Sequence, residues 1–80
     1  MDQELRGIVA EVFDMDPDQV TRDLTPESVD LWDSMNHLRL ITEVEDRLRV
    51  QFAMAEIQEI DSIGALQDLV ARYKSSGETD

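Results

Sequence analysis

The sequence predicts an all-α domain: a small four-helix bundle with three main helices, one short helix and a long loop between the first and second helices. Three observations lead to this prediction. Apolar residues recur at steps of three and four in three separate segments, which is typical of helices with one buried face. No segment alternates apolar and polar residues for long enough to indicate a strand. The 80 residues suffice for one domain and no more.

The first helix is expected from about Asp2 to Asp14. Asp2 and Glu4 lie near its start, where the helix dipole favours negative charge. Pro17 cannot continue a helix, so the segment should end near Met15. The apolar residues of this segment share one helical face, and they are Leu5, Ile8, Val9, Val12 and Phe13.

The connection over residues 16–33 is longer than most loops in compact domains, and loops of this length often carry function. We expect Val20 and Leu24 to point inward and hold the loop against the core. The segment 25–28, Thr-Pro-Glu-Ser, is typical of a cap followed by proline at the first helical position. It therefore predicts a single helical turn inside the loop.

The second main helix is expected from Ser34 to Leu48. Its apolar positions are Met35, Leu38, Ile41, Val44 and Leu48, with Leu40 widening the stripe, and Leu38 is expected mainly to pack inward. After Val50 and Phe52 dock inward, residues 53–60 predict a short helix. Residues 61–62, Asp-Ser, predict a cap for a last helix. The apolar residues of this last helix are Ile63, Leu66, Leu69, Val70 and Tyr73. The folded domain is expected to span residues 1–74, and residues 75–80 are expected to form a flexible tail.

Nineteen acidic residues against seven basic ones give the chain a net charge of −12. Such a charge repels nucleic acid and anionic membranes, and it attracts basic surfaces of other proteins. The chain has no cysteine, which excludes thiolate metal sites and cysteine nucleophiles and fits a reducing cytoplasm. No stretch approaches the roughly 20 apolar residues of a membrane span, and no signal peptide is recognisable. We expect a cytoplasmic monomer.

Neither a metal site nor a catalytic site is predicted. The segment 14–18 resembles the opening of an EF-hand calcium loop, but Gln19 and Thr25 stand where that loop needs glycine and glutamate. Asp33, Ser34 and His37 form a superficial hydrolase-like set. A helix holds these side chains roughly parallel, and no G-x-S-x-G elbow is present. We therefore expect a solvated acidic turn in the first case and an exposed His37 in the second.

The segment 31–38, Leu-Trp-Asp-Ser-Met-Asn-His-Leu, places Asp33-Ser34-Met35 at the start of the second main helix. Asp-Ser followed by Leu or Met at this place resembles the attachment motif of the acyl carrier and peptidyl carrier protein family. The apolar spacing that follows, then Phe52 and residues 60–70, are similar to the downstream pattern of the family. The resemblance extends over about residues 4–73, and it implies a small four-helix fold with a long first loop.

The resemblance implies that Ser34 accepts 4′-phosphopantetheine from coenzyme A, through a phosphopantetheinyl transferase and magnesium. The arm would carry acyl or aminoacyl intermediates as thioesters, so the chain itself would not be an enzyme. Asp33 would help the transferase recognise the site. Other partners would be a loading ligase and downstream enzymes of fatty acid, polyketide or related biosynthesis, and the space between helices would accept a growing acyl chain. The expected docking residues are Trp32, Met35, His37, Glu43, Glu45 and Asp46.

Two features depart from the family pattern. Leu31 stands where the family often has glycine, and the Trp32 beside it either offers a docking element or covers the core, the second reading being favoured. Arg39 stands at a position that is commonly acidic in carriers of fatty acid synthesis, which argues against docking to generic fatty acid synthase enzymes. The pattern of residues 32–35, Trp-Asp-Ser-Met, followed by His37 and Leu38 is more similar to discrete carriers of specialised biosynthesis. An alternative of another class stays open: an acidic helical adaptor that binds a basic protein surface without a prosthetic group. Such an adaptor would tolerate Ser34→Ala.

Overall fold

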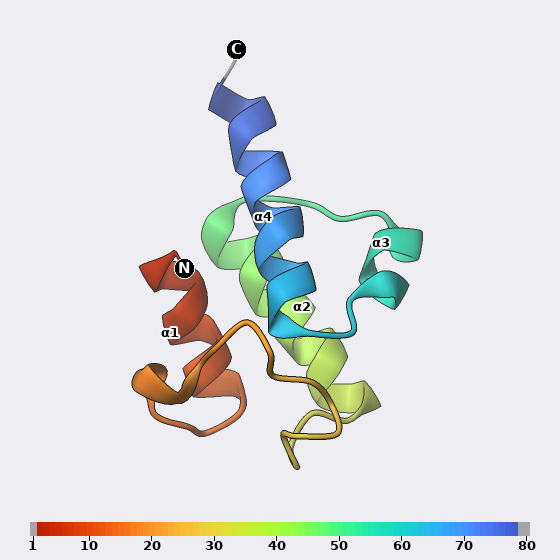
Figure 1. The fold of residues 1–80 in the computed structure, drawn as a ribbon. Helices are drawn as coiled ribbons and strands as arrows, with labels where there is room; N and C mark the ends of the chain where they lie inside the picture. Colours follow the sequence, from red (N-terminus) through yellow and green to blue (C-terminus); the bar gives the residue numbers. More distant parts are fainter. Residues whose placement is uncertain (1, 79–80) are drawn as a thin grey trace.

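The structure, a computed structural model, describes residues 2–78 of the chain and the side chains of residues 2–74. The elements in order are α1 (Gln3–Val12), the 3₁₀ helix η1 (Pro17–Gln19), α2 (Ser34–Leu48), α3 (Met54–Glu59) and α4 (Ile63–Glu78) (Figure 1). No strand occurs in residues 2–78, and the predicted fold of three main helices, one short helix and a long loop is confirmed. None of the helices in this part of the chain is both long and apolar enough to cross a bilayer.

Asp2 caps the start of α1. Its Oδ1 accepts hydrogen bonds from the N–H groups of Glu4 (2.8 Å) and Leu5 (3.3 Å). Its Oδ2 accepts a hydrogen bond from Lys74 of α4 at 2.6 Å, and this bond, with the two backbone N–H groups, lowers the pKa of Asp2. The helix ends at Val12, slightly before the predicted end, and Asp14 follows in the left-handed region with φ 52°. Asp2 thereby ties the first helix to the last.

The helical element of the long loop is η1, which the sequence analysis did not predict. It forms because the side chain of Asp16 caps the N–H of Asp18, while the side chain of Gln19 accepts from the N–H of Asp16. Pro17, read above only as a helix terminator, occupies the first position, where its missing N–H costs nothing. The single helical turn predicted at residues 25–28 is confirmed, because the carbonyl oxygen of Thr25 accepts hydrogen bonds from the N–H groups of Ser28 (3.0 Å) and Val29 (3.0 Å), and the turn does not continue into a helix.

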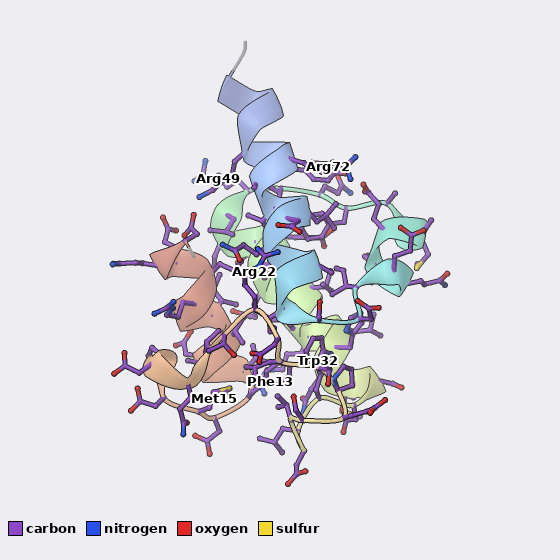
Figure 2. All side chains as sticks on the ribbon, in the orientation of Figure 1. Phe13, Met15, Arg22, Trp32, Arg49 and Arg72 are labelled. Atoms are coloured by element: carbon purple, nitrogen blue, oxygen red, sulfur yellow. The ribbon has the colours of Figure 1, made fainter. Side chains whose placement is uncertain are left out.

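The middle of the loop is fastened to the start of α4 (Figure 1). Val20 is buried and Leu24 is half-buried against the core, as predicted. The carbonyl oxygens of Arg22 and Leu24 accept hydrogen bonds from the N–H groups of Gly64 (2.8 Å) and Ile63 (3.0 Å). A Cβ at Gly64 would lie 3.1 Å from the Arg22 carbonyl oxygen, so a larger residue there would push the loop away by a few tenths of an ångström, and glycine fits this close approach. Figure 2 shows Arg22 lying across the N-terminal part of α4.

The core is shared by α1, α2, α4, the long loop and the residues flanking α3. In the described part of the chain its buried side chains are all apolar, so the burial of apolar area stabilises this small domain, which has no disulfide. Those members that are almost completely buried are Leu5, Ile8, Val9, Val20, Leu40, Val44, Ile63, Leu66 and Val70. The predicted inward faces of the first and last helices are therefore confirmed.

The short helix α3 is connected to the bundle by few contacts. Phe52 before it and Ile60 after it are buried, and Ile57 packs against the core from within the helix. Tyr73 of α4 donates a hydrogen bond to Glu56, which lowers the pKa of Glu56 and raises that of Tyr73. A helix of this length is not stable alone, so these contacts keep α3 in place.

The backbone of α4 continues to Glu78, beyond the domain end predicted at residue 74. Residues 79–80 of the expected flexible tail lie outside the described residues.

Candidate functional site

Ser34 is the first residue of α2, and the helix begins there because Asp33 caps it. Oδ1 of Asp33 accepts from the N–H of Asn36 at 2.8 Å, and its carbonyl oxygen accepts from the N–H of His37 at 2.8 Å. The first four N–H groups of a helix have no partner within it. Of these groups, the N–H of Asn36 is bonded by the Asp33 side chain and the N–H of Asp33 by the carbonyl oxygen of Leu31 (3.1 Å). This leaves the N–H groups of Ser34 and Met35 directed outward at the positive end of the helix dipole.

The Ser34 side chain is exposed, and its hydroxyl takes part in none of the side-chain hydrogen bonds formed by residues 2–74. Exposed apolar side chains surround it. Met35 is 78% exposed, Leu38 57% and Leu31 45%. The expectation that Leu38 packs mainly inward is thus wrong, because the buried arc of α2 is centred on Leu40, Ile41 and Val44, to one side of Leu38. Ser34 therefore lies at an accessible surface with exposed apolar side chains.

A cavity of about 590 Å³ opens beside Ser34, between the long loop, α2 and α3. Its lining includes Trp32, Ser34, His37 and Leu38 from the loop and α2, and Met54 and Ile57 from α3. Met54, which is 68% exposed, brings a fourth large apolar side chain to this region. A second hollow, of about 690 Å³, runs along α1 and does not include Ser34.

Trp32 is buried and His37 is half-buried, although His37 was expected to be exposed. The indole of Trp32 is only 4% exposed and packs on Phe13 with 5.2 Å between ring centroids (Figure 2), so the reading that Trp32 covers the core is favoured over docking. Nε1 of Trp32 donates to Nδ1 of His37 at 2.9 Å, and Nε2 of His37 lies 3.0 Å from the carbonyl oxygen of Ile57. The expectation of an exposed His37 is therefore wrong.

The position of His37 on the helix explains this. His37 precedes Ile41 by four residues and Val44 by seven, so it points along the buried arc of α2 and not away from it. Both of its ring nitrogens have partners other than Ser34. A histidine that activates a serine needs a ring nitrogen directed at the serine hydroxyl, so this geometry does not support a Ser/His hydrolase.

The three acidic residues expected to dock partners differ in their surroundings. Glu43 pairs with Arg47 at 3.0 Å, and Arg47 also contacts Glu11 of α1. Oε2 of Glu45 accepts from the N–H of Phe52 at 2.9 Å, which fixes the chain as it leaves α2. Asp46 is exposed. Asp46 can bind a partner without losing a contact within the protein, whereas Glu43 and Glu45 already have internal partners.

Asn36 was not singled out from the sequence. Its Nδ2 donates to the carbonyl oxygen of Leu31 at 2.7 Å, so Asn36 holds the segment before Ser34 from the first turn of α2. The signal for it was its place three residues after the Asp33 cap, where side chains often reach back over the helix start. Met54 and Ile57 were expected only as parts of a short helix, because their proximity to Ser34 depends on the tertiary fold.

Comparison with known proteins defines the class to which this fold and site belong. Residues 3–70 match a family model described as a phosphopantetheine attachment site. The chain therefore belongs to the phosphopantetheine-binding carrier protein family, whose members carry 4′-phosphopantetheine covalently and are not themselves catalysts.

A solved structure agrees with this assignment. The solution NMR structure of a holo acyl carrier protein from Geobacter metallireducens is similar to this chain, with a TM-score of 0.85 and 33% sequence identity. The match covers 95% of this chain and 87% of that one. No curated protein matches the chain.

Proposed function

We propose that this chain is a carrier protein in which Ser34 bears the 4′-phosphopantetheine arm. The arm holds acyl or aminoacyl intermediates as thioesters and presents them to enzymes of fatty acid, polyketide or related specialised biosynthesis, in the cytoplasm. The observation that carries the proposal is the exposed, unbonded hydroxyl of Ser34 at the start of α2, directly after the Asp33 cap. Family membership supplies the chemistry of the arm.

The residues around Ser34 fit a phosphopantetheine group. Attachment creates a phosphodiester on the Ser34 oxygen, and this anion would lie near the outward N–H groups of Ser34 and Met35. The helix dipole favours an anion at the same place. No large side chain covers the hydroxyl, so a transferase can reach it. In the transfer, the serine hydroxyl would lose its proton and its oxygen would bond to the pantetheine-side phosphorus of the coenzyme A diphosphate. The P–O bond to the other phosphate would break, and adenosine 3′,5′-bisphosphate would leave.

The apolar surface at this end of α2 supports a docking role for Met35 and Leu38. Both side chains are exposed next to Ser34, and exposed apolar patches often mark protein interaction sites. Between Ser34 and Thr42 helix α2 has no acidic residue, and it carries Arg39 on its exposed side. Partners would therefore meet an apolar surface near the arm, and Asp46 would be the nearest exposed acid on the same helix face.

The cavity beside Ser34 supports contact between the protein and its cargo. Its walls at Leu38, Met54 and Ile57 are apolar, so they would favour the apolar part of a bound acyl chain over water. Carrying the cargo in this cavity would shield the thioester until a partner docks. The size of the cavity, about 590 Å³, would limit how much of the cargo is covered.

Intact mass spectrometry tests the proposal. The purified chain is incubated with coenzyme A, magnesium and a broad-specificity phosphopantetheinyl transferase. We expect the mass to rise by one phosphopantetheine on the native chain and on Ser28→Ala, the matched control, because Ser28 is another exposed serine in a turn of the long loop. Ser34→Ala should gain nothing. A native chain that folds but stays unmodified would contradict the proposal and favour the adaptor.

A further inference from the structure

The ring of His37 joins two parts of the site that are far apart in sequence. It accepts a hydrogen bond from Nε1 of Trp32 at Nδ1 (2.9 Å), and its Nε2 is 3.0 Å from the carbonyl oxygen of Ile57. Because the indole N–H can only donate and a carbonyl can only accept, these partners require the neutral ring with its hydrogen on Nε2. The Trp32 and His37 rings are nearly parallel, with an interplanar angle of 14°.

Each partner of His37 belongs to a functional part of the site. Trp32 directly precedes the Asp33 cap, and its ring is locked in the core against Phe13 of α1. Ile57 belongs to α3, which forms the wall of the cavity opposite α2. His37 therefore spans from the segment that presents Ser34 to the wall of the cavity beside it.

The position of α3 is sensitive to such a link. The helix has only six residues, and the polar contacts that hold it to other elements are the His37 bond to Ile57 and the Tyr73 bond to Glu56, within the side chains described. A change of either contact can therefore shift α3. A shift of Ile57 moves one hydrogen-bond partner of His37. Because the other partner of His37 is Trp32, the shift can be passed on to the residue before Asp33.

We propose that His37 is a positioning residue of the carrier site, which couples the position of α3 to the segment 31–33 that presents Ser34. This rests on the proposed function of Ser34. Coupling between sites is reciprocal, so cargo that displaces α3 changes how Ser34 and its arm are presented, and a partner bound at Ser34 changes the affinity of the cavity for cargo. A partner could thereby distinguish a loaded carrier from an empty one.

Two substitutions separate the two bonds of His37. In His37→Asn the amide oxygen lies near the place of Nδ1 and keeps an acceptor for Trp32, but it cannot reach Ile57. In His37→Gln the amide nitrogen lies near the place of Nε2 and keeps a donor for Ile57, while the acceptor for Trp32 is lost. Trp32 is the chain's single tryptophan, so its indole N–H gives one unambiguous NMR signal.

The first readout is the hydrogen exchange rate of this indole N–H in the unmodified protein. We expect His37→Gln to raise the rate by roughly three- to tenfold, which corresponds to the loss of one hydrogen bond, and His37→Asn to leave it near the native value. Equal rates in the native chain and His37→Gln would show that the Trp32 bond does not form in solution and would overturn the proposal.

The second readout tests the coupling itself with Tyr73→Phe, which removes the Tyr73 bond to Glu56 and loosens α3 without touching α2 or Trp32. In the native background Tyr73→Phe should raise the indole exchange rate and lower the kcat/KM of the transferase by roughly twofold or more. With His37→Asn, which lacks the bond to Ile57, Tyr73→Phe should have no further effect on either quantity. Independent sites give effects that multiply. Equal effects of Tyr73→Phe in both backgrounds would therefore overturn the proposal.

The controls keep the two proposals apart. Circular dichroism checks that each variant is folded, and His37→Gln replaces His37→Asn as the uncoupled background if the latter is not folded. If the transferase leaves native Ser34 unmodified, the proposed function fails, yet the exchange measurements still decide the coupling. If native Ser34 is modified and the Tyr73→Phe effects multiply, the inference about His37 alone is wrong.

Discussion

The two halves of α2 differ in the chemical character of their exposed side chains. From Ser34 to Thr42 the helix has no acidic residue, and its exposed side presents Met35 and Leu38 beside the free hydroxyl of Ser34. From residue 43 to its end the helix is rich in charge, but its charged side chains largely bind within the protein. The exposed side of the half that begins at Ser34 is therefore accessible to partners, while the charged side chains of the other half mostly make contacts within the fold.

This difference changes what the acidity of the chain can do. A net charge of −12 suggests docking through acidic side chains, yet Glu43 and Glu45 of α2 already have internal partners. Charge would then attract basic partners from a distance, and apolar contact near Ser34 would decide the final fit.

The largest effect on stability is expected for Leu40→Ala. Leu40 is fully buried, so truncation leaves a cavity and should lower the free energy of unfolding by about 2–5 kcal/mol. Leu38→Ala, the same change two positions earlier, should cost no more than about 0.5 kcal/mol because Leu38 is 57% exposed. Urea unfolding of both variants measures this. Similar losses would show that Leu38 packs inward after all.

Glu45→Ala should have the next largest effect. It removes the acceptor for the N–H of Phe52 and should destabilise the fold by about 1–2 kcal/mol, because the donor loses a charged partner. Glu45→Gln keeps an oxygen there and should lose less than half as much. If Glu45→Ala instead leaves thermal unfolding unchanged and weakens partner binding, Glu45 is a docking residue and not a structural one.

Met35→Ala and Leu38→Ala should impair recognition without unfolding the chain. Each removes an exposed apolar side chain next to Ser34, and we expect each to raise the KM of the transferase by roughly fivefold with little change in stability, as for a contact worth about 1 kcal/mol. Leu31→Ala tests whether the loop side contributes as well. Unchanged transferase kinetics for both α2 variants would show that partners do not use this surface.

The smallest effects are expected for the acids at the other end of α2. Glu43→Gln removes one helix-surface ion pair with Arg47 and should cost about 0.3–0.5 kcal/mol of stability. Asp46→Asn should leave stability unchanged but slow association with a basic partner at low salt. The slowing should disappear at high salt. A salt-independent effect of Asp46→Asn would indicate direct contact in the bound state.

Much of the fold could be predicted from local signals. The bounds of α2 are those expected, because Asp33 is a strong cap and the apolar spacing continues to Leu48. The 3₁₀ helix η1 was missed because Pro17 also reads as a terminator, and the capping pair of Asp16 and Gln19 is too short a pattern to stand out.

The site was less predictable where tertiary contacts decide. Leu38 fits the apolar spacing of α2, but the apolar face of this helix is wider than the part that the other elements cover. Only the structure shows that Leu38 lies outside the covered part. His37 is in step with Ile41 and Val44, yet a polar residue was assigned to the surface by default. Its partner Ile57 lies 20 residues further along the sequence, and no local sequence pattern predicts that contact.

The most direct test of the account is to locate the modification. Fragmentation mass spectrometry of the chain, after incubation with transferase, magnesium and coenzyme A, shows which residue carries the added mass. The account predicts phosphopantetheine on Ser34 alone, with none on the Ser34→Ala variant treated in parallel. Modification at another serine, or of Ser34→Ala to the native extent, would contradict it.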